Sequence, residues 1–134
     1  MPDRHSLTAL WTPRLLGVLR IATGLLFLQH GTAKLLGFPH VAMFDTLQLV
    51  SLAGLAGVLE LVGGVLIIVG LQTRIVAFVL SGQMAVAYFM AHAGRSLYPI
   101  LNGGELAVLY CFVFLYFAAA GSGAWSLDAM RGRT

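Results

Sequence analysis

Ionisable, amide and imidazole side chains at the ends of long apolar stretches are the residues of this sequence that could do chemistry. In chain order they are His30, Lys34, His92, Arg95, Asn102 and Glu105. Acids, bases and imidazoles that meet between helices can hold an anion or a quinone and exchange protons with it. We therefore expect these side chains to form a binding site near one face of a membrane.

A structural explanation of the same residues stays open. Asn102 can cap the helix that follows it, Glu105 can complete a capping box three residues later, and Lys34 can extend to lipid headgroups. Haem ligation by His30 and His92 fits their similar depth, but two histidines without a further ligand pattern more often make hydrogen bonds. The cofactor of this cluster stays open, with quinone as one candidate; haem is disfavoured, and no metal site is predicted.

Three further polar residues lie deeper in the apolar stretches, namely Arg20, Glu60 and Gln83. A lone charge in hydrocarbon costs about 2.5 to 3.5 kcal/mol on insertion scales, so these side chains should point away from lipid. At about 1.5 Å per residue, the depths of Arg20 and Glu60 are close enough for long side chains to meet. We predict a buried Arg20–Glu60 pair, with Gln83 hydrogen-bonded in the same layer.

Four apolar stretches must position these residues. The chain has 134 residues, 59% hydrophobic and 10% charged, and its mean hydropathy is +0.90. Spans are predicted at about residues 13–36, 47–71, 74–92 and 102–120, followed by a short tail at 121–134. Continuous apolar runs without two-residue alternation favour helices over barrel strands. The sequence predicts an all-α, four-helix transmembrane bundle that forms a single domain over residues 1–134.

Basic residues collect on one side of the predicted bundle. The side of the termini carries Arg4, Arg14, Arg74, Arg131 and Arg133, whereas the opposite side offers Arg95 and Lys34. The positive-inside rule therefore places both termini in the cytoplasm. Because the charges follow topology, the net charge of +3 does not indicate a nucleic-acid partner.

Small residues favour close packing of the first two spans. Gly24 and Gly31 lie on the first span, and Gly57 and Gly64 lie on the second. Glycine lets two helix backbones approach in a membrane, where lipid offers no competing hydrophobic force. The same faces leave a homo-oligomer open.

Three segments, taken together and in order, resemble the DoxX family: RIATGLLFLQHGTAKLLGF, GVLELVGGVLIIVGLQTRIVA and NGGELAVLY. They extend over nearly the full length of the spans. The set combines the HGxxKL end of the first span, the ExxGG of the second, the GxxTR turn and the NGGE before the fourth. The residues carried over by these motifs are Arg20, His30, Lys34, Glu60, Gly63, Gly64, Arg74, Asn102, Gly103, Gly104 and Glu105.

This resemblance implies a multi-pass protein of the bacterial inner (cytoplasmic) membrane. It further implies a subunit or partner of a quinone-linked oxidoreductase or redox-stress system, with electrons supplied by another protein. Cys111 is the single cysteine, so a self-contained thiol oxidoreductase is not expected. Whether the chain is itself an enzyme stays open. The alternative is a non-enzymatic module for small-molecule transport or membrane assembly.

Overall fold

The computed structural model describes Met1 and residues 3–134, and all regular elements in this part of the chain are helical. The elements, in order, are α1 (Arg4–Leu36), η1 (Ala42–Phe44), α2 (Leu52–Val69), α3 (Thr73–Ala91), α4 (Pro99–Asn102), α5 (Glu105–Ala120) and α6 (Leu127–Met130). The helices α1, α2 and α3 are long and apolar enough to cross a membrane. The apolar helix α5, with 16 residues, is shorter. The all-α prediction is confirmed, and the three to four long apolar helices are consistent with a multi-pass membrane protein.

Three of the predicted helix starts were wrong, and the second helix begins at Leu52, after the N-cap Ser51, instead of near residue 47. The first helix begins at Arg4 instead of near residue 13, and Pro13 lies inside it. In its first turns the hydroxyls of Thr8 and Thr12 donate to the carbonyls four residues earlier. The fourth long helix begins at Glu105 instead of residue 102, because Gly103 adopts a left-handed φ of 74° that ends α4.

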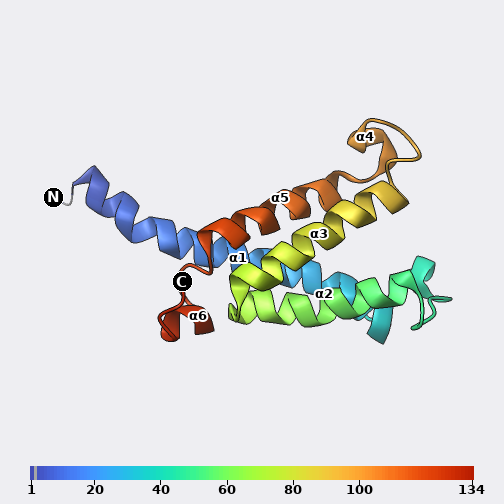
Figure 1. The fold of residues 1–134 in the computed structure, drawn as a ribbon, viewed down its shortest axis with the longest axis horizontal. Coiled ribbons are helices and arrows are strands. Elements are labelled where there is room, and N and C mark those ends of the chain that lie inside the picture. Colours follow the sequence, from blue (N-terminus) through green and yellow to red (C-terminus); the bar gives the residue numbers. More distant parts are fainter. Residues whose placement is uncertain (2) are drawn as a thin grey trace.

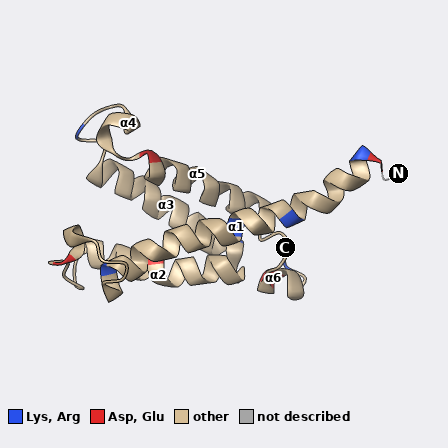
Figure 2. Ribbon diagram, turned by 180° about the vertical axis from the view of Figure 1, so that it is seen from behind, with Lys and Arg blue, Asp and Glu red and all other residues tan. Residues whose placement is uncertain are grey.

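The bundle consists of two helical hairpins (Figure 1). The helix α1 packs along α2, and α3 packs along α5, while α2 and α3 join the two hairpins. The hairpins diverge toward the end that carries η1 and α4, and both chain termini lie toward the opposite end (Figure 1). The charged positions are sparse along this framework, with one acidic position midway along α2 (Figure 2).

Glycines lie where α1 and α2 touch, as predicted. A Cβ added at Gly31 would lie 2.5 Å from the backbone nitrogen of Leu61, and one at Gly64 would lie 3.0 Å from the Cα of Leu28. These contacts fix the register of the hairpin, because no side chain fits between the two backbones. They place the last third of α1 directly against the middle of α2.

An aromatic core joins α1 to α5. The ring of Phe27 meets the edges of Tyr110 and Phe114, with centroids 5.3 and 4.9 Å apart. All three residues are buried, as is Phe117 one turn further along α5. Edge-to-face pairs of this kind stabilise a core beyond the area that they bury. The second hairpin is thereby held against the first at mid-depth.

Arg20 binds backbone carbonyls instead of the Glu60 carboxylate, which corrects the predicted pair. Its side chain is fully buried, with Nε donating 2.9 Å to the carbonyl of Ile67. The guanidinium also donates to the carbonyls of Ser122 and Trp125. The planar guanidinium group has five N–H donors. It can therefore bond several backbone carbonyls at once, without a carboxylate partner. The residues after α5 are therefore part of the folded bundle and not a free tail.

Asp128 closes the same end of the structure. Its carboxylate accepts hydrogen bonds from the backbone N–H groups of Gln72 and Thr73, at 2.9 and 2.8 Å, at the start of α3. Burial alone would raise the pKa of Asp128, but these two hydrogen bonds and the charge of Arg20 outweigh it, so its pKa lies below the usual value. The carboxylate thus acts as a distant N-cap for α3.

Gly31→Ala should destabilise the bundle by about 1 to 3 kcal/mol, because its new Cβ would force the α1 and α2 backbones apart. Gly82→Ala is the matched control, since Gly82 is exposed in mid-helix and a Cβ there meets no atom within 4 Å. It should leave the thermal unfolding temperature in detergent unchanged or raise it slightly. Equal effects of the two substitutions would contradict this packing.

Asp128→Asn should lower the free energy of unfolding by about 1 to 3 kcal/mol at neutral pH, because an amide cannot replace both accepting oxygens. A lowered folded-state pKa stabilises above the unfolded pKa, and this stabilisation is lost as pH falls through the folded pKa. The difference in stability between the wild type and the variant should therefore be smaller at pH 3 than at pH 7. Thermal unfolding at the two pH values measures it. Asp45→Asn is the control, since Asp45 pairs with His40 on the exposed surface.

Candidate functional site

The centre of the candidate site is an ion pair between α1 and α2. The Nζ of Lys34 lies 2.8 Å from Oε1 of Glu60, and the two side chains are 15% and 5% exposed. The ammonium group also lies 5.5 Å from the centroid of the Phe44 ring. The second carboxylate oxygen, Oε2, is buried and has no hydrogen-bond partner. One oxygen of this buried carboxylate is therefore left without a hydrogen-bond partner.

Helix geometry explains why these two residues meet. Gly31 packs against the backbone of Glu60 and Leu61, and Lys34 lies one turn beyond Gly31 on the same face of α1. The ammonium then reaches back along the antiparallel partner to the carboxylate. The structural explanation predicted that Lys34 extends to lipid headgroups. The structure shows instead that it pairs with Glu60.

Three more polar side chains surround this pair. The ring of His30 on α1 meets Tyr110 edge-on at 6.1 Å. Tyr110 on α5 is buried between this ring and that of Phe27. Gln83 of α3 donates through Nε2 to the carbonyl of Ala56, one turn before Glu60. We name the set His30, Lys34, Glu60, Gln83 and Tyr110 the polar layer.

The polar layer contains three of the four side-chain atoms that are buried without a partner in the described part of the chain. They are Oε2 of Glu60, Oε1 of Gln83 and the hydroxyl of Tyr110. Buried polar atoms in native proteins are normally hydrogen-bonded, so three such atoms in one layer indicate a place for a ligand or water. They come from α2, α3 and α5, and no single helix provides the site.

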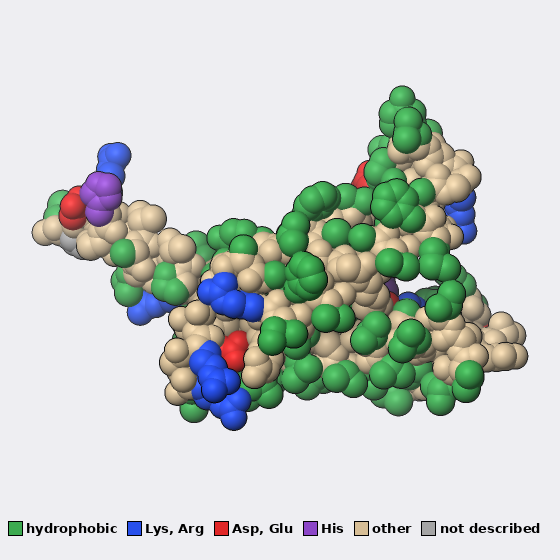
Figure 3. Space-filling view, viewed as in Figure 1, with side chains coloured by type: hydrophobic (Ala, Val, Ile, Leu, Met, Phe, Trp, Pro, Cys, Tyr) green, Lys and Arg blue, Asp and Glu red, His purple; other side chains and the backbone are tan. Residues whose placement is uncertain are grey.

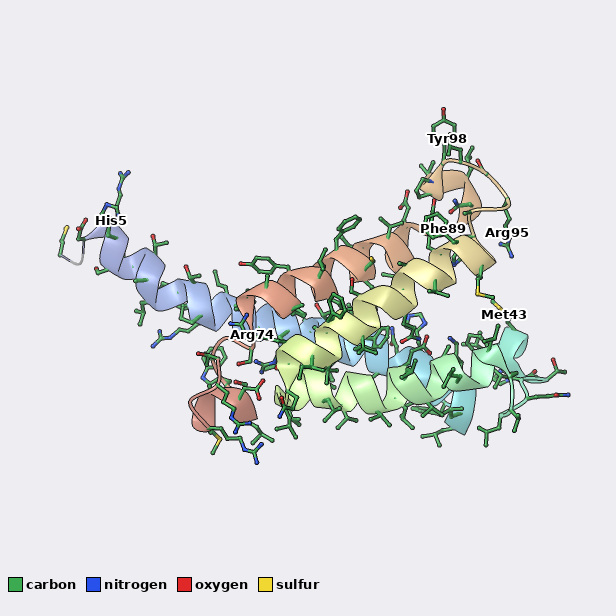
Figure 4. All side chains as sticks on the ribbon, viewed as in Figure 1. His5, Met43, Arg74, Phe89, Arg95 and Tyr98 are labelled. Atoms are coloured by element: carbon green, nitrogen blue, oxygen red, sulfur yellow. The ribbon has the colours of Figure 1, made fainter. Side chains whose placement is uncertain are left out.

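A hollow leads to this region from one end of the molecule. Figure 3 shows it between the α3–α5 hairpin and the α1–α2 hairpin, with imidazole and charged atoms at its inner end. Met43 of η1 lies at its outer edge, and Phe89 of α3 lies on the opposite arm (Figure 4). The walls of the hollow are apolar and its inner end is polar, which suits an amphipathic ligand.

Four of the predicted site residues lie in a different place. The Nδ1 of His92 is 3.0 Å from the carbonyl of Asn102, and the amide of Asn102 donates to the hydroxyl of Tyr88 and the carbonyl of Ser96. These bonds hold the connection between α3 and α5. His92 and Asn102 therefore bond to each other and to this connection, and they do not join His30 in the polar layer.

Arg95 and Glu105 are exposed and lie outside this network. Arg95 projects from the loop after α3 (Figure 4). Glu105 is the first residue of α5 and borders a surface groove of about 420 Å³. The predicted capping box was wrong, because Asn102 accepts from the N–H of Gly104 and Gly104 itself is the N-cap of α5. The structure therefore keeps only His30 and Lys34 of the six candidates in the polar layer.

Sequence reasoning missed Tyr110. It lies on an aromatic helix, shortly before Phe112 and Phe114, where a tyrosine resembles a packing residue. The available signal was its eight-residue distance from Asn102, which places it about two turns below the start of the fourth span. That depth matches the middle of the second span, where Glu60 lies.

Comparisons with known proteins agree with the fold and motifs described above. The DoxX family profile matches residues 15–93. A Haemophilus influenzae protein whose name states no activity is 47% identical over 127 residues, covering 88% of this chain and 91% of that protein. A Bacillus subtilis protein named "Putative oxidoreductase CatD" is 32% identical over 117 residues, covering 83% of this chain and 82% of that protein. No solved structure matches. This chain belongs to the DoxX family of membrane proteins.

Proposed function

We propose that this protein is a membrane subunit, or partner, of an oxidoreductase, and that its polar layer binds a quinone-type ligand between the two hairpins. The observation that carries the proposal is the free Oε2 oxygen of Glu60, buried beside the ammonium group of Lys34. The name of the Bacillus subtilis relative supports an oxidoreductase context. The ligand reaches the site through the hollow, from the hydrocarbon or from the adjoining interface.

The polar layer supplies the proton chemistry that such a ligand needs. Reduction of a quinone takes up two electrons and two protons, and oxidation of the quinol releases them. Glu60 and His30 can accept or donate protons at the ligand oxygens, and Lys34 balances the charge of the carboxylate. The electrons pass between the ligand and a partner redox protein.

The proposed setting is the bacterial inner membrane, with both termini in the cytoplasm. Arg74 lies near the end of the molecule where the C-terminal segment folds back, and Arg95 lies at the other end (Figure 4). Arg4, Arg14, Arg131 and Arg133 add to the charge on the side of the termini. The positive-inside rule then directs the mouth of the hollow to the outer face.

Glu60→Gln should abolish most of the binding of a short-chain quinone or quinol to the purified protein in lipid nanodiscs, measured by calorimetry. The amide keeps the volume of the carboxylate but removes its charge and its proton-accepting role. We expect affinity for the better-bound redox form to fall about tenfold or more, since hydrogen bonds to charged groups contribute about 1.5 to 3 kcal/mol.

Glu105→Gln is the matched control, because Glu105 is an exposed carboxylate outside the polar layer. It should leave the affinity unchanged. No quinone or quinol binding by the wild type, or equal loss in both variants, would argue against the proposal. If vesicles instead showed small-molecule flux that required Glu60 with no bound quinone, the transport alternative would replace it.

A further inference from the structure

The segment between α3 and α5 turns apolar side chains outward and polar atoms inward. We name its residues 96–104 the α4 loop. Its outer side carries Leu97, Tyr98, Ile100 and Leu101, whose exposed fractions lie between 63% and 83%. Its inner side carries Asn102, which is only 1% exposed. Loops in water normally show the reverse arrangement, with polar side chains on the outside.

The backbone of the α4 loop finds its hydrogen-bond partners inside the protein. The carbonyl of Tyr98 accepts from the N–H groups of Leu101 and Asn102, at 2.9 and 3.0 Å. The side chain of Asn102 donates to the carbonyl of Ser96 and accepts from the N–H of Gly104. Irregular backbone is tolerated next to hydrocarbon only where its polar groups are satisfied within the protein. These bonds meet that condition around the α4 turn.

The distribution of charge places the α4 loop at the membrane–water boundary. Residues 96–104 include no charged side chain, whereas Arg95 and Glu105 directly flank them. Both flanking residues are exposed. Because an exposed charge is costly in hydrocarbon, Arg95 and Glu105 belong at the level of the headgroups. The apolar residues between them then lie next to the acyl chains, as in segments that bind in the plane of the interface.

The outward surface of the α4 loop continues the apolar surface of α5. The loop projects from the end of the α3–α5 hairpin, on the side away from α1 and α2 (Figure 1). Tyr98 is directed away from the bundle (Figure 4). A groove of about 420 Å³ joins the loop to α5, where Leu106 and Leu109 are exposed. The groove is lined by Pro99, Ile100, Gly103, Glu105, Leu106 and Leu109. Acyl chains that cover α5 in a bilayer therefore also reach the loop.

We propose that the α4 loop is an interfacial anchor, which inserts Leu97, Ile100 and Leu101 among the acyl chains of the leaflet opposite the chain termini. Tyr98 keeps its ring in the apolar region and its hydroxyl at the headgroups, as tyrosines at membrane interfaces do. The partner of this surface is the lipid bilayer. The anchor is independent of the proposed function, because no residue of the polar layer takes part in it.

The test attaches a nitroxide spin label to Ile100→Cys or to Leu101→Cys, in a Cys111→Ser background that removes the single native cysteine. The purified protein is reconstituted in vesicles of phosphatidylethanolamine and phosphatidylglycerol. Both labels should collide more often with oxygen, which collects in hydrocarbon, than with a water-soluble nickel chelate. Their depth should be about 5 to 10 Å into the boundary between headgroups and acyl chains. Thermal unfolding checks that each labelled protein is folded.

The matched control carries the label at Asp45→Cys, because Asp45 is exposed and pairs with His40 on the surface of the other loop at this end. This label should collide more often with the nickel chelate than with oxygen. The same preference for the chelate at Ile100 and Leu101 would overturn the proposal, since the loop would then face water. Labels at these two positions that are shielded from both reagents would overturn it as well, because a second protein chain would then cover the loop.

Discussion

The ion pair between Lys34 and Glu60 is the interaction on which this account of the protein depends. It joins the end of one membrane helix to the middle of the next, and the Gly31 contact fixes the distance between them. A buried ion pair is costly to desolvate and is often no more stable than a well-packed apolar pair of the same volume. Its presence, with one carboxylate oxygen left unpartnered, therefore points to a role in binding instead of in folding.

Arg20 shows a different way to bury a charge in the same bundle. Backbone carbonyls from the end of α2 and from the segment after α5 take up its donors, and no carboxylate bonds to it directly. The carbonyl of Ile67 also accepts from the N–H of Gly70 where α2 ends, so Arg20 takes its second lone pair. Arg20 thus joins the two hairpins at the end of the termini, while the opposite end stays open around the hollow. Arg20 therefore holds the two hairpins together at one end of the bundle, and the pair of Lys34 and Glu60 forms the proposed ligand site toward the open end.

The sequence predicted the helical class, the approximate spans and the inward position of its charges, because hydropathy and the cost of charge in lipid act locally. The predicted pair of Arg20 and Glu60 was wrong. An estimate of depth along each helix does not show that the loop after α5 places its backbone carbonyls next to Arg20. Sequence reasoning also grouped Glu105 with Lys34, because both lie near span ends. Their separation is decided by the α4 turn and by helix rotation, which are tertiary features. Tyr110 entered the site through packing against Phe27, a contact with no sequence signature.

The most direct measurement is the stability and ligand binding of the double variant Lys34→Met with Glu60→Leu, compared with both single variants. Each single change should destabilise the protein by about 3 to 5 kcal/mol, because it leaves one uncompensated buried group. The double variant should recover stability close to that of the wild type but bind no quinol. A double variant that binds quinol normally, or single variants without any effect on stability, would contradict the central place given to this ion pair.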